Sequence, residues 1–164
     1  MASRVHTAGG GKTNAMRELD RANVAYESHV FERPEALSGV EVARTLGQDP
    51  QHVFKTLVTV GKSGEHYVFM VPVAEELDLK KAAAVVGEKA LHMVKSKELL
   101  GLTGYVHGGC SPLGMKKRFT TTIDETAELF DTIIFSGGRI GTQIETAPES
   151  LFSVMPVNSA DLVV

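Results

Sequence analysis

Lys55 is the first residue whose type and surroundings could support chemistry. It lies in residues 53–60, the strongest predicted strand, where Val53 and Leu57 share its face and the opposite face is also mainly apolar. Lysine is rarely buried in such surroundings without a partner. Two interpretations stay open. A partly buried ammonium could hold a carboxyl, phosphate or carbonyl oxygen, or act as an acid or base if its pKa falls, whereas a strand-end lysine could simply reach water.

The second candidate is the glycine-rich stretch at residues 108–114. The adjacent Gly108 and Gly109 permit positive φ and a close approach of backbone N–H groups, which can receive a carbonyl oxygen or oxyanion. The alternative is an ordinary turn, because Gly-Gly and Ser-Pro pairs are common there. Residues 136–138 form a similar stretch, for which a hairpin turn is the plain interpretation.

Covalent and metal chemistry find less support. Cys110 is the only cysteine, and His107 lies nearby as a possible base, but no third group is identifiable, so Cys110 is more simply a small apolar residue. The six histidines form no close pair at metal-ligand spacing, and we expect neither a metal nor a cofactor. Phosphate-binding-loop and serine-hydrolase patterns are not satisfied.

Composition predicts one ordinary domain. The chain has 164 residues, of which 43% are hydrophobic and 23% charged. Its net charge of -3 argues against a protein that coats nucleic acid non-specifically, because such proteins are usually strongly basic. A local basic patch at residues 116–118 stays open beside the alternative of a solvated surface. We expect a flexible tail over residues 1–12 and a single domain over 13–164. Neither a signal peptide nor an apolar run of membrane-spanning length is visible, which predicts a cytoplasmic protein.

Strands with interspersed helices predict an α+β fold. The expected sheet is mixed, mostly antiparallel, strongly curved and barrel-like, with helices on its flanks. The predicted helices span 13–22, 40–46, 78–86 and a short turn at 97–100. The predicted strands span 24–30, a hairpin of 53–60 and 67–71, a pair at 132–135 and 142–146 joined by a turn at 137–139, and a last strand at 151–155.

Taken together, these motifs resemble the YbaK/EbsC family of aminoacyl-tRNA deacylases, and in particular its Cys-tRNA(Pro) deacylase branch. The resemblance covers residues 24–146, and its segments follow the order of the family. They are residues 53–57, 72–74, 77–81, 103–105, 108–114 with 116–118, and 136–138.

The resemblance implies a free-standing relative of the editing domain of prolyl-tRNA synthetase, which hydrolyses the ester between an amino acid and the 3′ end of tRNA. By matching position, Lys55 is the essential lysine of the family, and Gly108 lies in the loop thought to contact the scissile carbonyl. The catalytic set is therefore Lys55, Gly108 and Gly109, and the expected substrate-binding set is Phe31, Ser111, Ser136, Gly137 and Gln143.

Two positions differ from well-known Cys-tRNA deacylases. Phe31 stands where some members have tyrosine, and Gln143 stands where an aspartate precedes the Ile-Glu pair. Both differences remove polar groups from the expected rim of the pocket, and so they concern the choice of amino acid more than deacylation itself.

The expected mechanism needs no protein nucleophile. Lys55 would position the ester or terminal ribose phosphate region, and the N–H groups of Gly108 and Gly109 would stabilise the carbonyl oxygen. The substrate's own thiol would attack in Cys-tRNA(Pro) or Cys-tRNA(Cys), whereas bound water would attack in Ala-tRNA(Pro). The expected partners are aminoacylated tRNA and a prolyl-tRNA or cysteinyl-tRNA synthetase, with no membrane. The alternatives are a non-catalytic amino-acid or nucleotide-binding module and a small-molecule ester or thioester hydrolase.

Overall fold

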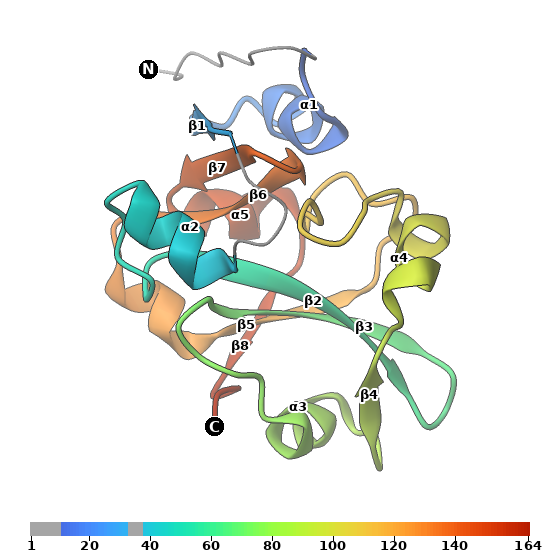
Figure 1. The fold of residues 1–164 in the computed structure, drawn as a ribbon. Coiled ribbons are helices and arrows are strands. Elements are labelled where there is room, and N and C mark those ends of the chain that lie inside the picture. Colours follow the sequence, from blue (N-terminus) through green and yellow to red (C-terminus); the bar gives the residue numbers. More distant parts are fainter. Residues whose placement is uncertain (1–10, 33–37) are drawn as a thin grey trace.

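The computed structural model describes residues 11–32 and 38–164, and it shows two separate sheets (Figure 1). The smaller has three strands in the order β1-β7-β6, and the larger has five in the order β4-β2-β3-β5-β8. The α+β class is confirmed, but the expected single barrel-like sheet is not closed. The strands are β1 (Glu27–Val30), β2 (Phe54–Gly61), β3 (His66–Pro72), β4 (Leu91–Met93), β5 (Thr120–Asp124), β6 (Ile133–Arg139), β7 (Thr142–Thr146) and β8 (Asn158–Ala160).

The predicted β2–β3 hairpin is confirmed, with antiparallel pairing from Phe54↔Pro72 to Val60↔His66. Parallel pairing then adds β5 to β3 and β8 to β5, and neither of these two strands was predicted. The two sheets meet where β2 begins, because Val53 forms an isolated parallel bridge with Ile134 of β6. This junction places the start of β2 beside the smaller sheet.

Several helices begin at a residue whose side chain caps them. They are α1 (Asn14–Arg21), α2 (Gly39–Thr45), α3 (Leu79–Val86), α4 (Ser96–Thr103) and α5 (Pro148–Val154), with a 3-10 turn at Glu125–Leu129. Ser38 and Glu41 form a complete capping box at α2. Asp78 caps α3 as expected, and α3 ends at Gly87 with φ 75°. Within the described part of the chain, no helix is long and apolar enough to cross a membrane.

Two local predictions are wrong. Residues 151–155, expected to form a strand, lie mainly in α5, because Pro148 occupies the helix start and leaves the following residues free to continue it. The expected turn at 137–139 is the end of β6, where a bulge lies between Ser136 and Arg139. The turn between β6 and β7 instead contains Gly141 with φ 86°. Residues 1–10 of the predicted tail lie outside the described residues.

The core lies on both sides of the larger sheet and under the smaller one. One cluster packs α1 and α5 against the smaller sheet and includes the fully buried Met16, Phe135 and Leu151. A second cluster packs α3 and the C-terminal segment against β3 and includes the fully buried Phe69 and Leu162. The first cluster also contains Phe54, Met70 and Ile123 of the larger sheet, so it packs the two sheets against each other.

We predict that Phe69→Ala lowers the free energy of unfolding by about 3–5 kcal/mol, because it removes a fully buried aromatic ring and leaves a cavity. Chemical denaturation measures this change. Leu129→Ala is the matched control, since Leu129 is 80% exposed and should change stability by less than about 0.5 kcal/mol. Equal effects of the two substitutions would contradict the packing described.

Candidate active site

A cleft of about 480 Å³ opens at the junction between the two sheets. Its walls come from the start of β2, from β6 and β7, from α2, and from α4 with the loop that follows it. In Figure 1, α2 and α4 lie on opposite sides of this junction. The predicted site residues that line the cleft are Phe31, Lys55, Gly108, Ser136 and Gln143.

Lys55 is the second residue of β2, opposite Val71 of β3, and its side chain is half-buried in the cleft wall. Among the described lining residues it is the only lysine, arginine, aspartate or glutamate. No carboxylate within the described segments forms an ion pair with it. Its ammonium therefore has no internal partner among the described residues and lies at a largely apolar cleft.

Gly108 lines the same cleft as Lys55 from the loop after α4, with a left-handed φ of 87°. Its N–H has no hydrogen-bond partner among the described residues. The N–H of Gly109, by contrast, donates to Val106 O at 3.0 Å, and Gly109 does not line the cleft. Of the two predicted donors, only the N–H of Gly108 therefore lacks an acceptor among the described residues.

Gly109 shapes the loop instead. A Cβ at this position would lie 2.9 Å from Ile140 N and 3.1 Å from Arg139 C, so only glycine allows the loop to approach the β6–β7 turn this closely. The loop that carries Gly108 is thereby fixed against the smaller sheet.

Two expected substrate-binding residues lie outside the cleft lining. Ser111 is fully buried, and its hydroxyl accepts a hydrogen bond from Leu113 N at 3.3 Å. Gly137 lies in the β6 bulge, where its carbonyl accepts from the Thr13 hydroxyl at 2.5 Å and a Cβ would lie 2.9 Å from Thr142 Cγ2. Both positions hold the walls rather than face a ligand.

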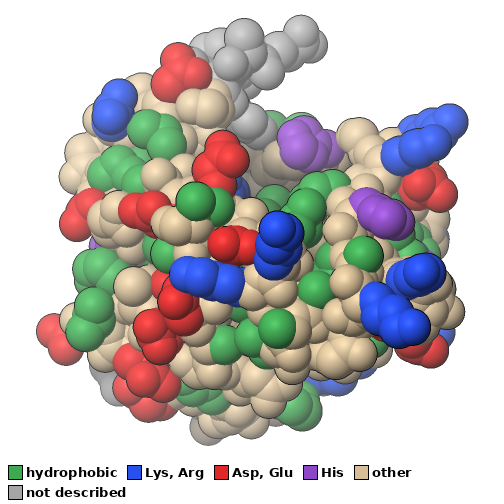
Figure 2. Space-filling model, turned by 90° about the horizontal axis from the view of Figure 1, so that it is seen from below, with side chains coloured by type: hydrophobic (Ala, Val, Ile, Leu, Met, Phe, Trp, Pro, Cys, Tyr) green, Lys and Arg blue, Asp and Glu red, His purple; other side chains and the backbone are tan. Residues whose placement is uncertain are grey.

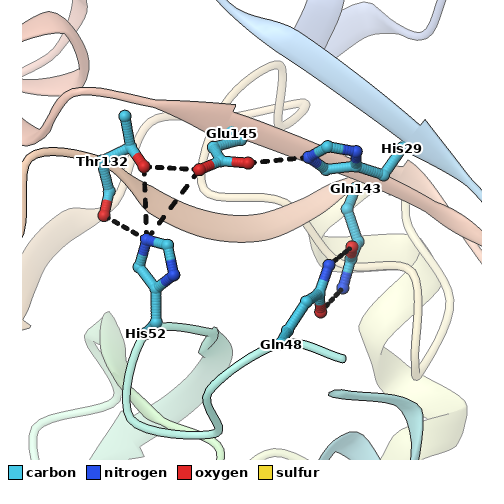
Figure 3. A network of polar contacts seen from close by, with 6 residues as sticks. All are labelled: His29, Gln48, His52, Thr132, Gln143 and Glu145. Atoms are coloured by element: carbon cyan, nitrogen blue, oxygen red, sulfur yellow. Dashed lines mark hydrogen bonds and ion pairs between the residues drawn. The ribbon is translucent and has the colours of Figure 1, made fainter. Parts of the chain in front are cut away.

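Gln143 lines the cleft with its amide already paired (Figure 3). Gln48 Nε2 donates to Gln143 Oε1 at 2.8 Å, and Gln143 Nε2 donates to Gln48 Oε1 at 3.2 Å. Gln143 is only 6% exposed. The neutral side chain is therefore held by a reciprocal bond to the loop between α2 and β2.

Cys110 lines the cleft but is buried, and burial raises the pKa of its thiol to about 11, although a hydrogen bond with Thr103 opposes this effect. The reactive thiolate is therefore scarce at neutral pH. His107 lines the same cleft but is exposed. The described residues thus supply no activated protein thiol.

Beside the cleft, Glu145 joins three segments of the chain (Figure 3). Its carboxylate accepts from the Thr132 hydroxyl at 2.5 Å, contacts His29 Nε2 at 2.8 Å and lies 4.0 Å from His52 Nε2. Burial raises the pKa of Glu145, but the hydrogen bonds from Thr132 and His29 and the nearby histidines outweigh it and hold the pKa below its ordinary value.

Glu27 completes a group of possible metal ligands with His29 and Glu145, whose ligand atoms lie within 4.8 Å of one another. Glu27 is exposed, and the contact between His29 and Glu145 already satisfies the other two. None of the three lines the cleft. The group therefore supplies no chemistry to the candidate site.

Sequence reasoning missed the apolar walls of the cleft. Val40 and Val42 come from α2, while Met93 and Leu99 come from β4 and α4. Their types and spacing match any core-facing segment, so no sequence signal separates them from ordinary core residues. Gln48 was missed for the same reason, because its role depends on a partner 95 positions away.

Comparison with solved structures defines the class of protein. The fold superposes on a protein provisionally described as a trans-editing enzyme for prolyl-tRNA synthetase, with a TM-score of 0.76, 26% identity and coverage of 92% of both chains. A hypothetical protein shares the fold with a TM-score of 0.84 at 20% identity, covering 93% of this chain and 100% of its own. The architecture is thus that of tRNA-editing proteins.

The chain belongs to the family described as the aminoacyl-tRNA editing domain, whose model matches residues 33–153. A protein of Enterococcus faecalis with the provisional name Cys-tRNA(Pro)/Cys-tRNA(Cys) deacylase EbsC is 46% identical over 144 residues, covering 87% of this chain and 88% of the relative. A proline–tRNA ligase of Shouchella clausii is 34% identical over 83 residues, or 51% of this chain and 14% of the ligase. The resemblance inferred from the motifs is confirmed.

We predict that iodoacetamide alkylates Cys110 slowly at pH 7.5 and faster as pH rises toward about 11, because only the thiolate reacts. Mass spectrometry reports the modification unambiguously, since the chain has one cysteine. Rapid labelling at neutral pH, comparable with free cysteine, would show that the thiol is activated and would contradict its burial.

We predict that Glu145→Gln lowers the free energy of unfolding near pH 7 and that the difference from the wild type shrinks in acid. A carboxylate whose pKa is lowered on folding stabilises the protein fully at pH values above its ordinary pKa of about 4.3. This stabilisation is lost as the pH falls through the lowered pKa of the folded state. Denaturation between pH 3 and 7 measures the effect. The exposed Glu128→Gln should show no such trend; a constant loss in Glu145→Gln at every pH would count against the ionic network.

Proposed function

We propose that this protein is a trans-editing hydrolase that cleaves the ester of mischarged Cys-tRNA(Pro) in the cytoplasm. The observation that carries the proposal is the placement of Lys55 and the free N–H of Gly108 on the same cleft. Family membership supports the reaction class. The provisional name of the relative from Enterococcus faecalis supports the choice of cysteine.

In the proposed complex, the 3′-terminal aminoacyl-adenosine enters the cleft with its carbonyl oxygen toward Gly108 N–H. One well-placed donor of this kind stabilises a developing oxyanion by roughly 3–4 kcal/mol. The Lys55 ammonium attracts the oxygen atoms of the ester or of the terminal ribose phosphate region, since no internal carboxylate among the described residues neutralises it. Positioning and charge thus replace a protein nucleophile.

The attacking group comes from the substrate or from solvent. Burial raises the pKa of Cys110 to about 11, which makes a covalent intermediate on the protein unfavourable. For a cysteinyl ester, the substrate's sulfur attacks its own carbonyl carbon, the bond to the ribose oxygen breaks, and a cyclic thioester leaves while the tRNA regains its hydroxyl. For other amino acids, water attacks the same carbon and the free amino acid leaves.

Beyond the 3′-terminal nucleotide, this protein is proposed to bind transfer RNA only weakly. The net charge is -3, and Figure 2 shows acidic, basic and hydrophobic side chains intermixed on the face that it displays rather than a continuous basic coat. A prolyl-tRNA or cysteinyl-tRNA synthetase that grips the same tRNA would raise the effective concentration of its acceptor end. Such a synthetase is the proposed partner.

We predict that the wild type releases labelled amino acid from Cys-tRNA(Pro) and that Lys55→Ala lowers this rate at least about a hundredfold, because the cleft then loses its only described cation. Release of labelled cysteine under single-turnover conditions, with and without prolyl-tRNA synthetase, measures the effect. Ala-tRNA(Pro) is assayed in parallel to separate the thiol route from the water route.

Lys62→Ala is the matched control. Lys62 is exposed and lies just beyond the other end of β2, and its substitution removes the same positive charge. Its rate should match the wild type. Release from Ala-tRNA(Pro) alone would contradict the choice of cysteine but retain the deacylase. No release from either substrate by folded protein with added synthetase would refute the enzyme and favour a binding module.

A further inference from the structure

Two groups of polar side chains connect the loop between α2 and β2 to the smaller sheet (Figure 3). Gln48 forms its reciprocal amide pair with Gln143 of β7. Four residues later, His52 Nε2 contacts Thr132 O at 2.5 Å and lies 4.0 Å from Glu145 of β7. We call these five residues the polar seam, namely Gln48, His52, Thr132, Gln143 and Glu145.

The Gln48 end of the polar seam is connected to α2 through the backbone. The N–H of Gln48 bonds to Ala43 O at 2.8 Å, so its backbone is joined to the last turn of that helix. At the other end of α2, Gly39 packs so tightly that a Cβ there would lie 2.9 Å from Val73 Cγ1. Between these two anchors, Val40 and Val42 form part of the apolar wall of the cleft.

The Gln48–Gln143 pair connects this wall to the smaller sheet by polar contacts, and one of its members, Gln143, itself lines the cleft. Gln143 is 6% exposed, so loss of its partner leaves an amide without compensation in a nearly dry place. The wall would then shift or the amide would turn into the cleft. Either change alters the space beside the substrate without touching Lys55 or Gly108.

We propose that Gln48 is a positioning residue that sets the amino-acid selectivity of the cleft by holding Gln143 and α2 at a fixed separation from β2. This inference rests on the proposed function, since it names what limits the side chain of the aminoacyl group. The pair fixes the width of a neutral, mostly apolar subsite, and substrates with larger side chains are excluded by the α2 wall rather than by a charged group.

The test uses two hydrolysis-resistant probes, 3′-alanylamino-3′-deoxyadenosine and 3′-methionylamino-3′-deoxyadenosine, with the full chain. Isothermal titration gives the ratio of their dissociation constants. The wild type should favour the alanyl probe, and Gln48→Leu should reduce this preference about tenfold, the scale of discrimination that a pocket wall provides. Gln143→Leu should have the same effect, and the double variant should add nothing further because both changes remove one pair.

Gln51→Leu is the matched control, because Gln51 lies in the same loop but donates to Glu75 on the surface. It should leave the preference unchanged. Gln48→Glu should restore selectivity only in part, since its carboxylate still accepts from Gln143 Nε2 but cannot donate to Gln143 Oε1. Hydrogen exchange of the α2 amides should quicken in Gln48→Leu and not in Gln51→Leu.

A wild type that binds both probes equally would overturn the inference, as would additive effects or a uniform loss of affinity in Gln48→Leu. These results are distinct from failure of the proposed function. Deacylation without any change of selectivity refutes the role of Gln48 alone, whereas a wild type that neither deacylates tRNA nor binds either probe refutes both.

Discussion

The bridge between Val53 and Ile134 is the contact on which the rest of the site depends. It joins two sheets whose other strands are paired separately, and it places the start of β2 against β6. Lys55 follows two residues later, and Ser136 follows two residues after Ile134. One backbone pairing therefore brings residues 81 positions apart in the sequence to the same cleft. Helices α2 and α4, and the loop after α4, then only need to close the remaining sides.

Within the described segments, the site combines one cation that has no ion-pair partner with one backbone N–H that has no acceptor, in a largely apolar space. Such an arrangement favours positioning and charge stabilisation over covalent catalysis, and burial of Cys110 points the same way because its pKa rises to about 11. The two glycines of the loop differ: Gly108 lines the cleft and its N–H has no partner among the described residues, while Gly109 allows the loop to pack closely against Ile140. This chemistry suits a small substrate that is attacked either by a nucleophile of its own or by a water molecule.

The sequence revealed the elements whose signals are local. Alternating and β-branched residues predicted the β2–β3 hairpin, and Asp78 with Gly87 predicted α3. The strand predicted at residues 151–155 was wrong because a short apolar run fits either a strand or a buried helix. Strands β5 and β8 were not predicted, because they pair with strands that are distant in the sequence. In the site, Lys55 and Gly108 stood out as unusual types in unusual places. Gln48 and the α2 wall did not, because glutamine and valine acquire their roles only through tertiary contacts.

The central claim is that the ester lies between Lys55 and Gly108, and a nuclear magnetic resonance titration tests it most directly. The labelled protein is titrated with 3′-cysteinylamino-3′-deoxyadenosine, and the amide of Gly108 and the ammonium of Lys55 are observed. The account predicts that both signals shift together and saturate at the same concentration, while the exposed Lys62 stays unchanged. Saturable shifts confined to residues outside the cleft, with Gly108 and Lys55 unaffected, would contradict it.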